Sequence, residues 1–141
     1  MVTVSKPRII VDTGPLVAFL VEHDRYHPWA DSLFHELPVP FVTCEAVLTE
    51  TYFLISKLPD APGRFFEFLS SGLIEIGVSI LGEKTSLANL MRKYRDVPMS
   101  LADACIVRLS ELHPEAQVFT IDSDFRLYRS HGRRQIPLII P

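Results

Sequence analysis

Two aspartates stand directly after short runs of apolar, β-branched residues. Asp12 follows Ile9-Ile10-Val11, and Asp122 follows Val118-Phe119-Thr120-Ile121. Such runs are typical of buried parallel strands, and open α/β sheets bind ligands at the carboxyl ends of their strands. We therefore expect both carboxylates at one edge of a sheet. An aspartate after a strand often only begins a turn or caps the next helix, so neither residue alone indicates a site.

A third acid, Glu50, lies on the apolar face of an expected helix. At about 100° per residue, a helix over residues 44–57 surrounds Glu50 with Ala46, Val47, Phe53 and Leu54. We therefore expect its carboxylate to point toward the core. An unpaired charge there would cost on the order of several kcal/mol, so the group must be paired, protonated or bound to a metal. The alternative is a long stem that carries the carboxylate to the rim of the core.

A fourth acid, Asp103, lies in an expected helix over residues 101–112. It shares a face with Met99, Ile106 and Val107. Ser100-x-x-Asp103 also fits a capping box, which would explain this acid without any chemistry. An aspartate in the first turn of a helix can both cap the helix and face a metal, so the two interpretations remain open.

The four acids together indicate a metal site. If the strands are parallel, all four carboxylates meet above one edge of the sheet. Carboxylates within a few ångströms of one another cannot all be ionised at neutral pH without a compensating cation. No lysine lies on these helix faces. A hard divalent ion with oxygen ligands, Mg²⁺ or Mn²⁺, is the expected counter-charge, and the cysteines and histidines have no zinc spacing.

The elements that must position these acids follow from the hydrophobic pattern. Short β-branched runs alternate with amphipathic stretches, which is typical of an α/β fold with a parallel sheet covered by helices on both faces. The expected strands are residues 8–11, 41–43, 73–78, 117–121 and 138–140. The expected helices include 44–57, 62–71 and 101–112, one that carries residues 30–37 and one that carries residues 87–94.

Composition limits the class of protein. The chain has 141 residues, 48% of them hydrophobic, and no long linker or internal repeat, so we expect one domain over residues 1–141. The net charge of −3 gives no overall field to hold a polyanion. We interpret Cys44 and Cys105 as reduced, partly buried thiols. Acidic and helix-breaking residues interrupt the apolar run 9–21, which predicts no membrane span or signal peptide and a cytoplasmic protein.

Basic residues follow the fourth acid. They are Arg126, Arg129, Arg133 and Arg134, with Tyr128 and His131 among them. This segment is a candidate contact for the phosphates of RNA. The alternative is a solvated loop that serves solubility.

The order and spacing of these motifs resemble those of the PIN-domain ribonucleases, particularly the VapC-type toxins. The matching segments are Ile9-Ile10-Val11-Asp12-Thr13, residues 43–50, Ser100-Leu101-Ala102-Asp103-Ala104, and residues 119–125. The resemblance implies a three-layer α/β/α domain whose central five-stranded parallel sheet has the order 3-2-1-4-5.

The resemblance also implies an activity. It implies a Mg²⁺- or Mn²⁺-dependent endoribonuclease, the toxin of a type II toxin–antitoxin system. Asp12, Glu50, Asp103 and Asp122 match the acidic quartet of the family as catalytic and metal-binding residues. Asp124 is a neighbour that could share the role of Asp122.

Further expectations come from the same resemblance. Thr13 and Thr120 would support the site through their hydroxyls. The family implies a homodimer and a cognate antitoxin. The aromatic residues Tyr52, Phe53, Phe65, Phe66 and Phe68 exceed what one helix face can bury, so some of them are candidates for a partner surface.

Two alternative functions remain open. The first is a non-catalytic PIN-like module that uses the acidic pocket to bind a basic peptide or a protein partner. The second is a phosphoryl-transfer domain, because Asp122-Ser123-Asp124 imitates the Asp-x-Asp of haloacid dehalogenase-like phosphatases. Against the second, this motif comes late in the chain, and no lysine follows the last expected strand, as a receiver domain would require.

Overall fold

A five-stranded parallel sheet forms the centre of the structure, a computed structural model that describes residues 7–141. Its strand order is β3-β2-β1-β4-β7. The strands are β1 (Ile9–Val11), β2 (Phe41–Cys44), β3 (Ile74–Val78), β4 (Gln117–Phe119) and β7 (Leu138–Ile139). The expected class and strand order are confirmed. The fifth strand is β7 because β5 (Arg129–Ser130) and β6 (Arg134–Gln135) first form a separate antiparallel hairpin.

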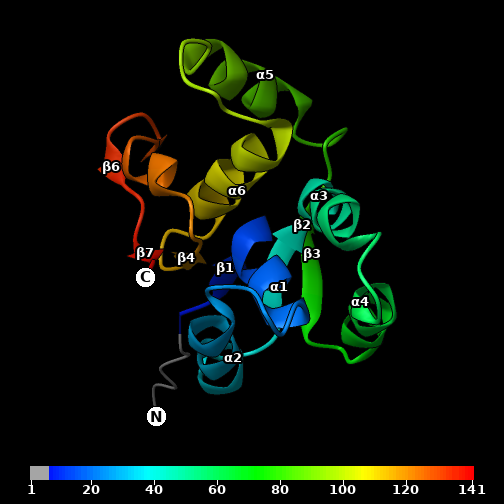
Figure 1. Ribbon diagram of the computed structural model, residues 1–141. Coiled ribbons are helices and arrows are strands. Elements are labelled where there is room, and N and C mark those ends of the chain that lie inside the picture. The colour runs from blue at the N-terminus through cyan, green and yellow to red at the C-terminus, as the bar shows by residue number, and fades with distance from the viewer. Residues whose placement is uncertain (1–6) are drawn as a thin grey trace.

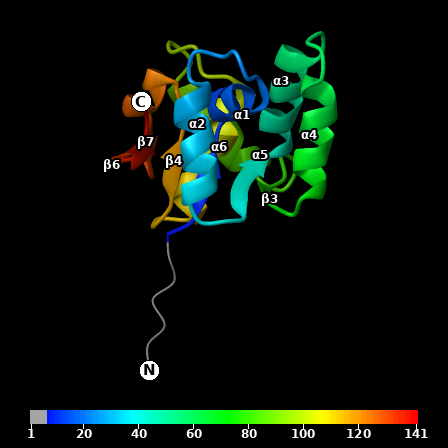
Figure 2. The same cartoon turned by 60° about the horizontal axis from the view of Figure 1, so that its bottom comes forward.

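Helices cover both faces of this sheet. In residues 7–141 they are α1 (Thr13–Leu20), α2 (His27–Glu36), α3 (Glu45–Ile55), α4 (Ala61–Ser70), α5 (Lys84–Lys93) and α6 (Leu101–Leu112). Helices α5 and α6 lie on one side of the sheet and α1 and α2 on the other (Figure 1). Helices α3 and α4 run side by side (Figure 2). None of the helices described is long and apolar enough to span a membrane.

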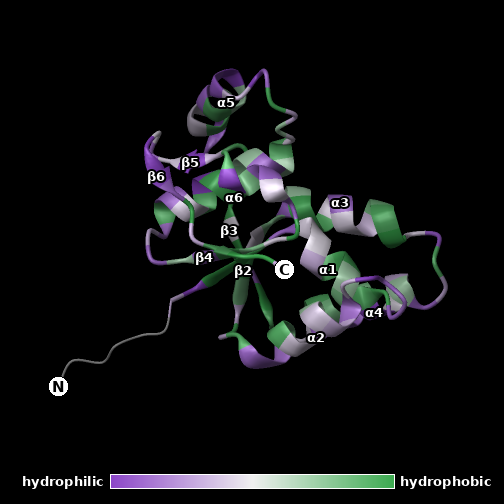
Figure 3. Ribbon diagram, turned by 60° about the vertical axis from the view of Figure 1, so that its left-hand side comes forward, coloured by the Kyte–Doolittle hydropathy of each residue, from purple (hydrophilic) through white to green (hydrophobic). Residues whose placement is uncertain are grey.

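The middle strands form the core. Every residue of β1 and β2 is buried, and hydrophobic residues concentrate at the centre of the sheet (Figure 3). A parallel strand covered on both faces cannot alternate polar and apolar residues, which is why these strands are visible in the sequence as continuous apolar runs. Cys44 and Cys105 are both buried and free.

Three elements are not predicted from the sequence: helix α1, the 3₁₀ turn η1 (Ser123–Arg126) and the hairpin β5–β6. Helix α1 lies in a run that is apolar on all sides, so it shows no 3.6-residue period, and Pro15 is tolerated because it lies in the first turn. The hairpin β5–β6 was interpreted as a loop because each strand has two residues and carries an arginine. The expected helix 101–112 has the same bounds as α6, and the ends of α3 and α4 differ from the expected 44–57 and 62–71 by one or two residues, the usual uncertainty of such boundaries.

Gly77 permits α6 to pack closely on β3. A Cβ atom at this position would overlap the side chains of Val42 and Leu109. We expect Gly77→Ala to lower the free energy of unfolding by about 1–3 kcal/mol, the usual cost of overpacking a core. Chemical denaturation would measure it. Gly63→Ala is the control, because a Cβ there meets nothing within 4 Å and alanine favours the helix. Equal stability of the two variants would contradict this packing argument.

Candidate active site

Four acidic side chains from four different elements line one pocket. Asp12 follows β1, Glu50 lies on α3, Asp103 lies in the first turn of α6, and Asp122 follows β4 by three residues. They border a cavity of about 270 Å³ together with Thr13, Gly14, Leu54 and Ile121. The cavity lies at the carboxyl edge of the sheet because β1 and β4 are adjacent and parallel.

Asp12 is buried and held by one of its oxygens. Its side chain is 6% exposed, and the Thr120 hydroxyl donates to its Oδ2 at 2.7 Å. Burial raises the pKa of Asp12 to about 7, and the neighbouring Asp103 and Asp122 carboxylates add to this effect. Asp12 is therefore partly protonated near neutral pH unless a cation lies beside it.

Thr120 connects two of the acids. Its hydroxyl donates to Asp12 and accepts from the backbone N–H of Asp122 at 3.0 Å. Asp122 in turn accepts the backbone N–H of Asp124 at its Oδ1, 2.8 Å away, and so caps the short 3₁₀ turn η1 (Ser123–Arg126). Asp124 does not line the cavity that contains the four acids.

Asp103 caps its own helix and also faces the pocket. Its backbone N–H donates to the Ser100 hydroxyl at 3.0 Å, and its Oδ2 accepts the Ser100 N–H at 3.1 Å, which completes the capping box expected from the sequence. The Tyr128 hydroxyl donates to the same oxygen at 3.3 Å. Burial raises the pKa of Asp103, and these donors oppose the shift.

The expectation that Glu50 points toward the core is wrong. Helix α3 buries Val47, Thr51 and Ile55, while Glu50 is exposed at the rim of the pocket. The polar Thr51 can lie on the buried face because its hydroxyl donates to the Val47 carbonyl at 2.7 Å. Because Thr51 is polar, the hydrophobic pattern places the buried face of α3 about one residue away from its true position. Partial burial still raises the pKa of Glu50, and the charges of Asp103 and Asp122 contribute.

The carboxylates of Asp12, Asp103 and Asp122 share one feature. In each, the hydrogen bonds described above occupy a single oxygen, Oδ2, Oδ2 and Oδ1 respectively. The protein thus orients each group mainly through one oxygen, and the backbone of Thr13 adds a hydrogen bond to Asp12. No lysine or arginine lines the cavity. Carboxylate oxygens whose charge no lysine or arginine neutralises are suitable ligands for a hard divalent cation such as Mg²⁺ or Mn²⁺.

The side chains are not gathered tightly enough to coordinate an ion as they stand. Within residues 7–141, no three acidic, histidine or cysteine side chains form a group that could hold one metal ion. Binding would therefore require the carboxylates to move inward. Thr13 adds a further unsatisfied group at this edge, because its hydroxyl oxygen is buried without a hydrogen-bond partner. The Thr13 hydroxyl, unlike that of Thr120, makes no hydrogen bond to the acids in this arrangement.

The basic residues after Asp122 are divided among several roles. Arg126 ends η1, and Arg133 and Arg134 lie on the hairpin; all three are exposed. Arg129 instead donates to the backbone carbonyls of Arg126 and Tyr128, at 2.7 and 3.1 Å. The guanidinium of Arg129 therefore stabilises the local backbone, in addition to any contact that it makes with a ligand.

Tyr128 is the functional candidate that the sequence did not reveal. In the sequence it lies among the arginines of the candidate RNA contact, whereas in the structure it is completely buried. Its ring packs against Tyr94 and Phe125, and its hydroxyl contacts Asp103. That contact spans 25 positions in the chain, so no local motif indicates it.

The aromatic residues of α3 and α4 divide as expected between core and surface. Phe65 and Phe68 are buried, whereas Phe66, Phe53 and Tyr52 are 56%, 77% and 37% exposed. The exposed rings remain candidates for a partner surface.

Comparisons with known proteins point to one family. The family model described as the PIN domain matches residues 9–130. No curated protein matches the chain. The crystal structure of VapC20 from Mycobacterium tuberculosis, a toxin that cleaves the sarcin-ricin loop, superimposes with a TM-score of 0.71. The similarity covers 82% of this chain and 91% of that one at 20% sequence identity, which shows a shared fold.

Proposed function

The chain belongs to the PIN-domain family, and from this premise we propose that it is a divalent-metal-dependent endoribonuclease. The observation that carries the proposal is the single pocket lined by Asp12, Glu50, Asp103 and Asp122, with Thr120 bridging two of the acids. The catalytic unit is one PIN-like domain over residues 1–141. The cofactor is Mg²⁺ or Mn²⁺, and the substrate is RNA.

The residues in and around the pocket have different roles in phosphodiester hydrolysis. Asp12, Asp103 and Asp122 would hold the cation through their carboxylate oxygens, and Asp124 would assist only by orienting Asp122 through its backbone N–H. The cation supplies charge neutralisation at the phosphate and makes water more acidic. Glu50, exposed at the rim, faces the entering water and substrate. Arg126, Arg129, Arg133 and Arg134 contribute positive charge along the RNA.

The biological role follows from the same family. We propose a VapC-type toxin that acts in the cytoplasm as a homodimer and is inhibited by a cognate antitoxin. The fold shared with VapC20 and the exposed rings on α3 and α4, which offer a surface to a protein partner, support this role.

The chemistry of the products tests the proposal. Because a water molecule rather than the ribose 2′-hydroxyl attacks, cleavage should leave 3′-hydroxyl and 5′-phosphate ends. Purified protein would be incubated with total RNA in Mg²⁺, in Mn²⁺ and in EDTA, and the new ends mapped. Products that end in 2′,3′-cyclic phosphates would contradict this route. Absence of cleavage with either metal would favour a non-catalytic PIN-like module that binds a protein.

Tyr128 should affect cleavage and the Mg²⁺ requirement by positioning the carboxylate of Asp103. Tyr128→Phe removes one of the two donors to Asp103 Oδ2. We expect cleavage to fall by roughly 10- to 100-fold, as for other partners of metal ligands, and half-maximal activity to need more Mg²⁺. Tyr94→Phe is the control, because its buried hydroxyl accepts from the Arg129 N–H and touches no acid. Equal metal dependence in the two variants would show that Tyr128 serves only packing.

A further inference from the structure

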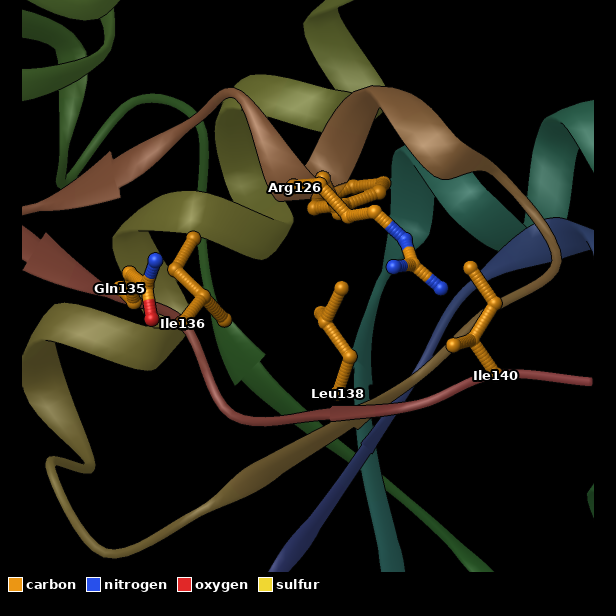
Figure 4. A pocket seen from close by; sticks show the side chains of 6 residues that line it. Arg126, Gln135, Ile136, Leu138 and Ile140 are labelled. Carbon is orange, nitrogen blue, oxygen red and sulfur yellow. The ribbon is translucent and has the colours of Figure 1, made fainter.

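A second pocket lies between the turn η1 and the C-terminal segment that contains the edge strand β7. It has a volume of about 370 Å³ and is lined by Phe125, Arg126, Gln135, Ile136, Leu138 and Ile140 (Figure 4). This volume is within the range of small-ligand pockets. Of its lining residues, the function proposed above uses only Arg126, as positive charge along the RNA.

The two pockets are joined by short, hydrogen-bonded segments. The turn η1 begins after Asp122, which lines the acidic pocket, and ends at Arg126, which lines the second one. Four residues of 3₁₀ helix span roughly 8 Å. On the other side, the Ile139 carbonyl accepts the N–H of Thr120, the residue that bridges Asp12 and Asp122. This short connection is the basis for placing both pockets along one strand of RNA.

The lining groups suit a flat ligand with a polar edge. Leu138 and Ile140 project from the same face of the chain, two residues apart, and form an apolar wall with the buried Ile136 and Phe125. The guanidinium of Arg126 reaches across the opening toward Ile140, and the amide of Gln135 lies at the opposite end (Figure 4). Arginine planes and apolar side chains stack on unpaired RNA bases, and a glutamine amide both donates to and accepts from a base edge.

Charge favours a nucleotide over an acidic or basic peptide. None of the lining residues is an acid, and the exposed Arg134 precedes Gln135 on β6. Arg126 and Arg134 therefore place positive charge at a pocket whose lining has no carboxylate to repel phosphate.

We propose that this pocket is a subsite for one unpaired nucleobase of the RNA substrate, stacked by Arg126 and read at its edge by Gln135. The inference rests on the proposed ribonuclease function and adds a basis for sequence preference to it. The acidic pocket acts on the sugar-phosphate backbone, which is common to all RNA sequences, whereas this subsite distinguishes bases.

Binding to short RNAs tests the subsite without cleavage. Fluorescein-labelled hexamers of A, C, G and U would be titrated with wild-type protein in EDTA, and dissociation constants measured by anisotropy. We expect unequal affinities for the four hexamers. Arg126→Ala should weaken the preferred hexamer by roughly 5- to 150-fold, the range for loss of one stacking contact, and should bring the four affinities together. Gln135→Glu, which replaces a donor with an acceptor, should change their order.

Arg133→Ala is the matched control, because Arg133 is exposed and does not line the pocket. It should weaken all four hexamers by the same factor. The subsite is overturned if Arg126→Ala and Gln135→Glu also act uniformly, or if the wild type binds the four hexamers equally or not at all. These outcomes are independent of the cleavage assay. Base preference without cleavage would contradict the proposed ribonuclease function and support the subsite. Cleavage without base preference would support the ribonuclease function and contradict the subsite.

Discussion

Asp12→Asn should reduce RNA cleavage by more than roughly 100-fold, beyond the loss typical of residues that only support a metal ligand. The side chain keeps its size and can still accept from the Thr120 hydroxyl, so the fold and the β1–α1 connection are preserved. What disappears is the negative charge of the most buried acid in the pocket. Of the three carboxylates that would hold a divalent cation, only those of Asp103 and Asp122 then remain, and the affinity for the cation falls.

The measurement compares initial rates of cleavage over a range of Mg²⁺ concentrations. Asp96→Asn is the matched control, because Asp96 is an exposed aspartate that does not line the cavity, and it should cleave like wild type. Asp124→Asn answers a separate question. Its backbone N–H, not its carboxylate, contacts Asp122, so we expect a much smaller loss than for Asp12. Wild-type cleavage by Asp12→Asn would remove the basis for the proposed active site.

The parts of this site that depend on local sequence were predictable. Asp12 and Asp122 could be placed because a strand buried on both faces must be apolar throughout, so its end is visible in the sequence. Asp103 could be placed because a capping box requires its partner, Ser100, three residues earlier. In both cases the physical constraint acts over fewer than about five residues, so a single sequence contains it.

The parts that depend on tertiary contacts were not predictable in the same way. Thr51 satisfies its own hydroxyl inside the helix, so its polarity hid the buried face of α3 and misplaced Glu50. Tyr128 acquires its role from Asp103, which lies in another element. The second pocket forms only when η1, β6 and β7 come together. None of these relations has a period or motif in the sequence.

The stability of the metal-free protein should fall as the pH rises from about 4 to about 7. Burial raises the pKa of Asp12 from 3.8 to about 7 in the folded protein. Between these values Asp12 is protonated when folded and ionised when unfolded, so unfolding releases a proton and becomes more favourable with increasing pH. Below pH 4 the group is protonated in both states, and above pH 7 it is ionised in both. The destabilisation is therefore complete above pH 7.

The difference between wild type and Asp12→Asn isolates this contribution. Asparagine does not titrate, so in EDTA the variant should match wild type near pH 4 and exceed it above pH 7 by roughly 2–4 kcal/mol in the free energy of unfolding. Denaturant titrations at several pH values would measure the difference. A difference that does not change with pH would contradict the buried, protonated Asp12.

Mg²⁺ should reverse the destabilisation of the folded protein only at a pH at which Asp12 is ionised. At pH 8 the ionised carboxylates repel one another, and a bound cation stabilises the folded state in proportion to its occupancy. At pH 5 protons already occupy Asp12, so the same Mg²⁺ concentration should stabilise much less. The Asp12→Asn variant should gain little at either pH. The carboxylate charges that destabilise the metal-free folded protein are therefore the same charges that bind the cation on which cleavage depends. Cation binding at this pocket thus comes with a lower stability of the metal-free protein.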